Sequence, residues 1–126
     1  MDHHLITRNR LLAALAPSDF ALLAPQLTAF SLDEGAILQE ADTPIDEVYF
    51  PIRGLISLAT VMRTGEMVET AMVGREGAIG SFAGLTSVHA SARAMVQIPG
   101  TAAAIPASRL RAAVSRSEGL RQAILQ

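Results

Sequence analysis

The sequence predicts an α+β fold that is mainly β: an antiparallel double-stranded β-helix, or jelly roll, with flanking helices at both ends. Two observations lead to this prediction. Short apolar runs separated by Gly, Pro or Asp fill residues 29–106, which is typical of a sandwich or barrel of short strands. Apolar residues at helical spacing occur on either side, in residues 9–28 and 107–126. With 126 residues, the chain is expected to form one domain.

The segment before the β region is predicted to form two helices. Asn9 is a suitable N-cap for a short leucine-rich helix, and Pro17 is expected to end it. Ser18 or Asp19 is expected to open the second helix, whose apolar residues lie on one face. Pro25 is expected to kink that helix or to end it early, because proline cannot donate the helical hydrogen bond.

The β region is predicted to contain seven or eight short strands. Turn-forming residues recur at roughly the eight-to-twelve-residue spacing of all-β domains. Arg63-Thr64-Gly65-Glu66 has the composition of a hairpin turn. The other predicted turns lie at residues 33–35, 42–44, 53–54 and 99–100.

The last segment returns to helical spacing. An apolar stripe predicts one helix after Pro106, and Ser117 is a suitable N-cap for a second. Leu120 and Ile124 share a face of that second helix. Because no Gly or Pro closes it before Gln126, we expect it to be the start of a longer helix, with Leu120 and Ile124 facing a partner.

The composition excludes several classes of function. Only 17% of the residues are charged and the net charge is −2, with all ten cations being scattered Arg, so we do not expect this domain to bind DNA by its own surface. The chain has no Cys, which excludes disulfides, thiolate zinc sites and Cys nucleophiles. No apolar run is long enough to span a membrane, and the N-terminus lacks a signal-peptide pattern. We therefore expect a cytoplasmic domain without membrane contact.

Catalytic and metal-binding patterns are lacking as well. The sequence contains no Gly-x-Ser-x-Gly elbow, P-loop or Gly-x-Gly-x-x-Gly motif. The carboxylate pairs at 33–34 and 46–47 are expected in turns or at strand starts, not as an acid–base couple. The three His residues do not form the His-x-His pattern of a cupin metal site. We therefore expect no enzyme and no metal, with a cupin-like enzyme as the remaining outside alternative.

Several segments carry a resemblance to a known family. Ile45-Asp46-Glu47-Val48-Tyr49-Phe50-Pro51-Ile52-Arg53-Gly54 contains a Tyr-aromatic-x-x-x-Gly block, and Val73-Gly74-Arg75-Glu76-Gly77-Ala78-Ile79-Gly80 is rich in glycine. Ala104-Ile105-Pro106 precedes the C-terminal helices. Together with the element order, these segments resemble the effector-sensing domain of the bacterial Crp/Fnr regulators, which has the cyclic-nucleotide-binding fold. The resemblance runs from about Asn9 to Gln126.

The resemblance implies a ligand site at the glycine-rich segment. In the family pattern, backbone N–H groups and an Arg hold a cyclic phosphate, and a Glu holds the ribose hydroxyl. On this chain the Glu position falls at Ser81 and the Arg position at or near Ala90, so both side chains differ from the pattern. The same glycines are also typical of ordinary turns in a β-roll. The candidate ligand-binding residues are Gly74, Gly77, Gly80, Ser81, Phe82, Ser91 and Arg93.

The resemblance also implies a role. A cyclic nucleotide or another small effector would bind in the β-roll and act on the C-terminal helix, through which a homodimer would form. DNA would be read by a winged helix-turn-helix domain absent from this chain. Two alternatives stay open: a stand-alone module for a ligand other than cyclic AMP, and a degenerate roll that binds nothing and serves for dimerisation.

Overall fold

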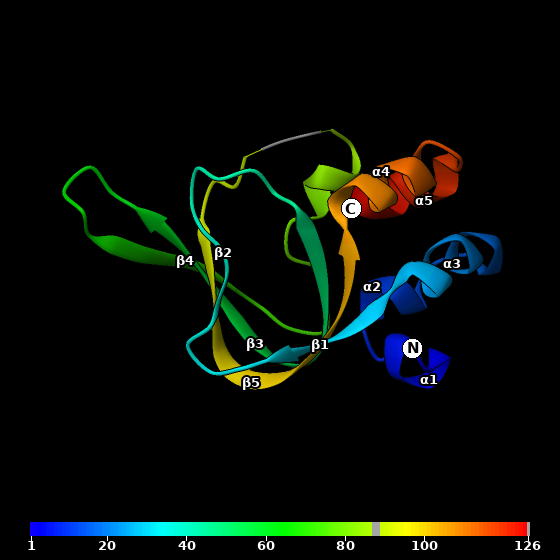
Figure 1. Cartoon of the computed structure of the whole chain (residues 1–126), viewed down its shortest axis with the longest axis horizontal. Coiled ribbons are helices and arrows are strands. Elements are labelled where there is room, and N and C mark those ends of the chain that lie inside the picture. The colour runs from blue at the N-terminus through cyan, green and yellow to red at the C-terminus, as the bar shows by residue number, and fades with distance from the viewer. Residues whose placement is uncertain (87–88, 126) are drawn as a thin grey trace.

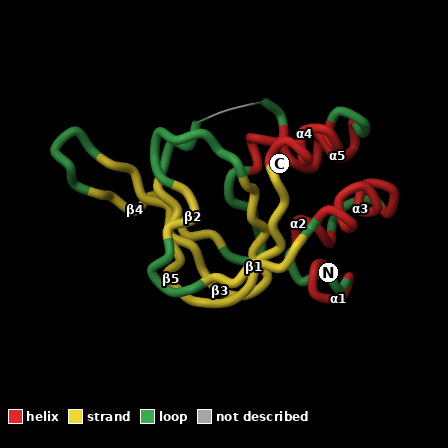
Figure 2. The backbone as a smooth tube through the Cα atoms, in the orientation of Figure 1, coloured by secondary structure: helices red, strands yellow, loops and turns green. Residues whose placement is uncertain are grey.

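The computed structural model describes residues 1–86 and 89–125 of the chain. A strongly curled antiparallel sheet forms the body, and the helices from both ends of the chain gather on one side of it (Figures 1 and 2). The predicted fold class, mainly β with helices at both ends, is therefore confirmed. The sheet curls toward the segment between residues 74 and 92, just before the last strand. This segment carries the candidate site.

The N-terminal helices differ in detail from the prediction. Asn9 caps its helix as predicted, with Oδ1 accepting from the N–H groups of Leu11 (3.0 Å) and Leu12 (3.1 Å). Pro17 does not end that helix but begins the next, because the first helical position needs no N–H donor. Pro25 falls in a 3-10 turn that ends the helix, as expected. The elements are α1 (His3–Ile6), which the sequence did not predict, α2 (Arg10–Ala13), α3 (Pro17–Leu23) and η1 (Ala24–Gln26).

The sheet contains five strands in the described residues, not seven or eight. Their order is β1-β5-β3-β4, with β2 also paired to β5, and every pairing is antiparallel. The predicted hairpin joins β3 to β4, where the Met62 N–H donates to the Glu66 carbonyl at 2.7 Å. The strands are β1 (Thr28–Leu32), β2 (Ile37–Gln39), β3 (Glu47–Val61), β4 (Met67–Val73) and β5 (Arg93–Pro106).

Two predicted turns lie inside strands. Residues 53–54 are part of β3 and residues 99–100 are part of β5, where the two strands face each other with shifted register. Gly54 has a φ of +98°, and a Cβ on Gly100 would fall on the carbonyl of Arg53. The two glycines therefore let the backbones of β3 and β5 come close together and bend at the same place. Both strands then continue in the sheet.

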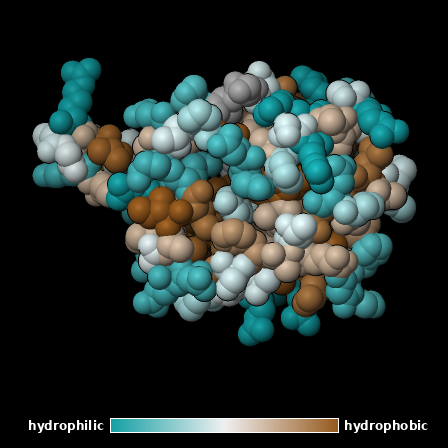
Figure 3. Space-filling model, viewed as in Figure 1, coloured by the Kyte–Doolittle hydropathy of each residue, from teal (hydrophilic) through white to brown (hydrophobic). Residues whose placement is uncertain are grey.

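The β3–β4 hairpin extends away from the body of the domain (Figures 1 and 3). All residues from 61 to 72 are exposed. Four of its large apolar side chains are more than 40% exposed, namely Val61, Met62, Met67 and Val68.

The C-terminal helices, α4 (Ala107–Val114) and α5 (Glu118–Leu125), pack into the core of the domain. Leu120 is fully buried and Ile124 is 5% exposed, both in one cluster with residues of the N-terminal helices. The expectation that Leu120 and Ile124 face a partner is therefore wrong, because this face of α5 covers the domain's own core. No helix in the part of the chain that the structure describes is long and apolar enough to cross a membrane.

Ser117 connects the two ends of the domain. Its Oγ accepts from the N–H of Leu120 at 3.1 Å, which confirms the predicted N-cap of α5. The same hydroxyl donates to the carboxylate of Asp19 on α3, a side chain that is 7% exposed. One hydroxyl thus caps the last helix and ties it to the first thirty residues.

Candidate functional site

A cavity of about 440 Å³, here called the main cavity, lies between the 3-10 turn η2 (Ser81–Gly84) and the β-roll. A volume of this size falls within the range of small-molecule sites. Its described lining residues are Gln39, Ile45, Leu58, Ala78, Ile79, Gly80, Ser81, Phe82, Leu85, Thr86, His89, Ala90, Ser91 and Ala92.

The segment that carries η2 is fixed to the roll on both sides. Before η2, Tyr49 and Ile79 exchange backbone hydrogen bonds of 3.0 and 2.8 Å. After it, the Ala90 carbonyl accepts from the N–H of Asp42, and the Ala90 N–H donates to the Thr43 carbonyl, both at 2.8 Å. These bonds attach the segment before η2 to β3 and the segment after it to the turn at residues 42–43.

Gly80 sets the direction of η2. Its φ of +81° is the left-handed conformation that favours glycine. A Cβ at this position would lie 3.0 Å from Cγ2 of Ile45 and 3.3 Å from Oε1 of Gln39. Glycine therefore permits both the turn and the close approach of η2 to the wall formed by Gln39 and Ile45.

The described lining of the main cavity is mostly apolar. Among its described residues there is no Arg, Lys, Asp or Glu. The polar lining side chains are Gln39, Ser81, Thr86, His89 and Ser91. The Oε1 atom of Gln39 is buried and has no hydrogen-bond partner within residues 1–86 and 89–125.

The structure brings four of the predicted site residues together. Gly80, Ser81, Phe82 and Ser91 all line the main cavity. Ala90, at the position of the family's Arg, also lines it and is 3% exposed.

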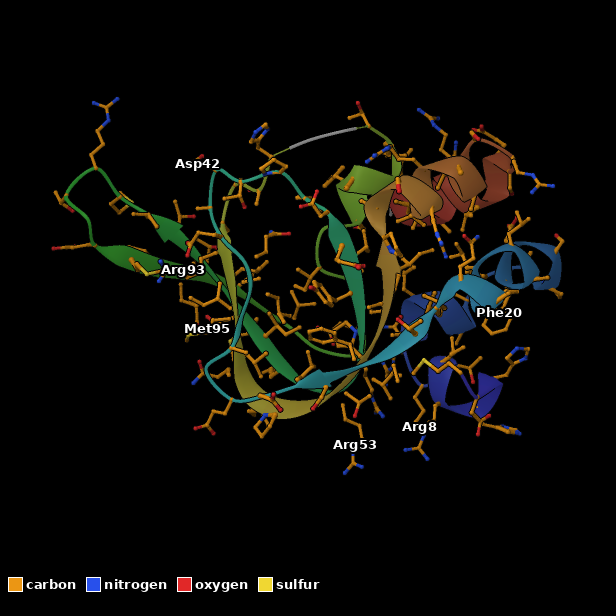
Figure 4. All side chains as sticks on the ribbon, viewed as in Figure 1. Arg8, Phe20, Asp42, Arg53, Arg93 and Met95 are labelled. Atoms are coloured by element: carbon orange, nitrogen blue, oxygen red, sulfur yellow. The ribbon has the colours of Figure 1, made fainter. Side chains whose placement is uncertain are left out.

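The other three predicted residues lie elsewhere. Gly74 donates its N–H to Oε1 of Glu76 (3.0 Å), and the carbonyl of Gly77 accepts from Nδ2 of Asn9 (2.9 Å). Arg93, on β5 beside the start of the hairpin (Figure 4), donates Nε to Oε1 of Glu40 at 2.7 Å. None of the three lines the main cavity.

Sequence reasoning missed Gln39, Ile45 and His89. Gln39 and Ile45 lie in and after β2, far from the glycine-rich segment in sequence. No motif marks Gln39, and the segment that Ile45 opens gives no sign of a ligand site, because the place of both residues at the cavity depends on how the sheet curls. Within the described residues, no group of three or more His, Asp or Glu side chains is placed to hold a metal ion.

A second cavity of about 260 Å³ shares the Gln39 and Ile45 wall with the main cavity. Its lining includes the carboxylates of Glu40, Asp46 and Glu47. Burial raises the pKa of the Glu47 carboxyl, and the charge of Asp46 adds to this effect. The Oε2 atom of Glu47 is buried without a hydrogen bond in the described part of the chain.

Glu47→Gln is expected to change how stability depends on pH. Because the pKa of Glu47 is raised, the folded chain keeps this proton to a higher pH than the unfolded chain does. The contribution of Glu47 to the free energy of unfolding is therefore present below the ordinary carboxyl pKa of 4.5 and is lost as pH rises through the raised value. The variant should lack this loss, so its stability relative to that of the unmodified chain should increase as the pH rises above 4.5.

Urea unfolding at a series of pH values measures this difference. Glu34→Gln, which changes an exposed carboxylate in the turn before β2, is the control and should follow the unmodified chain. Parallel stability curves for Glu47→Gln and the unmodified chain would show that the Glu47 pKa is not raised.

Comparison with known proteins agrees with this geometry. The family model described as "Cyclic nucleotide-binding domain" matches residues 29–117. Comparison with curated proteins finds no match.

Three solved structures illustrate the likeness. The N-terminal domain of a transcriptional regulator from Streptomyces coelicolor A3(2) is 22% identical, with a TM-score of 0.75 over 96% of this chain and 85% of that chain. The sensor domain of the transcriptional regulator DNR from Pseudomonas aeruginosa is 17% identical, with a TM-score of 0.76 over 97% of this chain and 82% of that chain.

The third structure is the regulatory domain of Toxoplasma gondii PKA with cAMP, which is 15% identical, with a TM-score of 0.77 over 89% of this chain and 45% of that chain. At these identities the three structures support the fold. The family assignment rests on the sequence match, which includes all but the first residue of β1, the strands β2 to β5, η2 and α4. This chain belongs to the cyclic nucleotide-binding domain family.

Proposed function

We propose that this domain is the effector-sensing unit of a Crp/Fnr-type transcription regulator, in which a small molecule bound in the main cavity acts on the C-terminal helices. The role is regulatory and cytoplasmic, not catalytic. The observation that carries the proposal is the position of η2, which forms a wall of the main cavity on one side and contacts α4 on the other.

The contact between η2 and α4 is close. Nη1 of Arg111 donates to the carbonyl of Ala83 at 2.9 Å. Gly84 is buried, and a Cβ there would lie 2.8 Å from Cδ2 of Leu110. Because packed cores deform little, a ligand that moves η2 must also move α4 or lose these contacts.

Dimerisation and DNA binding belong to the same proposal. A homodimer would form through the C-terminal helical region, and DNA would be read by another domain. Since Leu120 and Ile124 are occupied by the core, the contact in α5 would use its exposed side, where Leu125 is 44% exposed. The main cavity also fits the alternative of a stand-alone module for another ligand. A degenerate roll that binds nothing would not require such a cavity.

Arg111→Ala is expected to uncouple the main cavity from α4. Cyclic AMP, cyclic GMP and indole are used as probes, and a probe that binds should raise the melting temperature of the chain. With that probe bound, amide hydrogen exchange should slow in both η2 and α4 of the unmodified chain. In Arg111→Ala, the probe should slow exchange in α4 at least about threefold less than it does in the unmodified chain. The dissociation constant of the probe should stay within about threefold of its value for the unmodified chain.

Arg109→Ala, on the exposed side of the same helix, is the matched control and should behave like the unmodified chain. The proposal fails if no probe raises the melting temperature. It also fails if a probe binds and exchange in α4 is unchanged. A concentration-dependent dimer without binding of any probe would favour the dimerisation alternative.

A further inference from the structure

The lining of the main cavity points to a class of ligand. We propose that the main cavity takes an uncharged, mostly apolar small molecule that donates an N–H or O–H hydrogen bond to Oε1 of Gln39. This inference rests on the proposed function, since it names the effector class for the same site. It differs from what the family resemblance implies, because a cyclic nucleotide carries a negative charge.

The charges around the main cavity disfavour an anion. No Arg or Lys is found among its described lining residues. Arg93 is held by Glu40 (2.7 Å), and Arg111 donates to the carbonyl of Ala83 (2.9 Å) on the other side of η2. The second cavity, which shares a wall with the main one, is lined by three carboxylates. An anion in the main cavity would lose water without an Arg or Lys to pair with, which is unfavourable.

Gln39 supplies the directional contact. Its side chain lines the main cavity, and its Oε1 atom has no hydrogen-bond partner over the described residues. That atom is buried against Gly80, so the Gln39 amide must rotate toward the cavity to accept a hydrogen bond from a ligand. A buried acceptor without a donor destabilises the empty protein, and a ligand that donates to it removes this penalty. A ligand with only acceptors would leave the Gln39 oxygen unpaired.

The remaining walls suit an apolar body. Ile45, Leu58, Ile79 and Leu85 line the main cavity. Phe82 lines it too, and its side chain is 65% exposed, which is high for a large aromatic residue. An apolar ligand that covers this ring removes exposed apolar surface from water and gains ring-to-ring contact.

Three small probes with one ring system test the proposal. Indole is neutral and has one N–H donor, 1-methylindole lacks the donor, and indole-3-acetate adds a negative charge. Calorimetric or NMR titration of the chain should give dissociation constants at least about tenfold weaker for 1-methylindole and for indole-3-acetate than for indole. Cyclic AMP should bind more weakly than indole as well.

Gln39→Leu separates the hydrogen bond from the shape of the main cavity. The variant should bind indole and 1-methylindole equally, and its melting temperature should be unchanged or raised by about 3 °C, because an unpartnered buried oxygen is removed. Gln97→Leu, on an exposed position of β5, is the matched control and should keep the tenfold difference.

The outcomes distinguish this inference from the proposed function. Absence of indole binding, or equal binding of indole and 1-methylindole by the unmodified chain, overturns the ligand class. Tighter binding of cyclic AMP than of indole also overturns it and leaves the sensor role intact. Indole binding that depends on Gln39 but does not slow exchange in α4 supports the ligand class and contradicts the sensor role.

Discussion

Gly100→Ala is expected to lower the free energy of unfolding by about 3 kcal/mol or more. A Cβ at Gly100 would fall on the carbonyl group of Arg53 and lie 2.8 Å from the backbone nitrogen of Gly54. All of these atoms are backbone, so no side chain can rotate away to make room. The pairing of β3 with β5 would have to separate where both strands bend.

Chemical denaturation followed by circular dichroism measures this loss. Gly65→Ala is the control, because Gly65 has a φ of +89° in the hairpin turn and nothing lies within 4 Å of its Cβ position. It should lose only about 1 kcal/mol, from backbone strain alone. Equal losses for the two variants would show that close approach at Gly100 does not limit the fold.

Asn9→Ala is expected to lower the free energy of unfolding by about 3 kcal/mol. Asn9 is fully buried and uses all of its side-chain groups. Its Nδ2 donates to the carbonyls of Pro51 (2.8 Å) and Gly77 (2.9 Å), while its Oδ1 caps α2. Alanine would leave two carbonyls and two N–H groups without a partner in the interior.

Asp2→Ala is the matched control for this change. Asp2 caps α1 with one hydrogen bond of 2.9 Å to the N–H of His4, and it is exposed. Its loss should cost at most about 1 kcal/mol. The same urea titration serves both variants, and a cost below about 1 kcal/mol for Asn9→Ala would mean that water replaces the lost bonds.

The order of the elements could be predicted because local rules decide it. Asn9 and Ser117 cap their helices by contacts within three residues, and the hairpin at 63–66 closes on itself. The number of strands could not be predicted. Gly54 and Gly100 look like turn residues in sequence, and only the facing strand decides that the chain bends there without leaving the sheet.

The candidate site could be predicted only in part for the same reason. Gly80 and Ser81 belong to a continuous glycine-rich segment, so a motif could locate them on the wall of the main cavity. Arg93 lies three residues after Ala90 in the sequence, but its pairing with Glu40 holds it outside that cavity. Gln39 carries no motif and reaches the main cavity only through the curl of the sheet.

The hydrogen bond between Asp19 and Ser117 has a consequence for the domain as a mechanical unit. It joins positions 98 residues apart in sequence, and Ser117 also caps α5. A force or displacement applied at the C-terminal helix is therefore passed to α3 as well as to η2. The opening helices therefore anchor α5, so removing them should loosen α5 even though they do not line the main cavity.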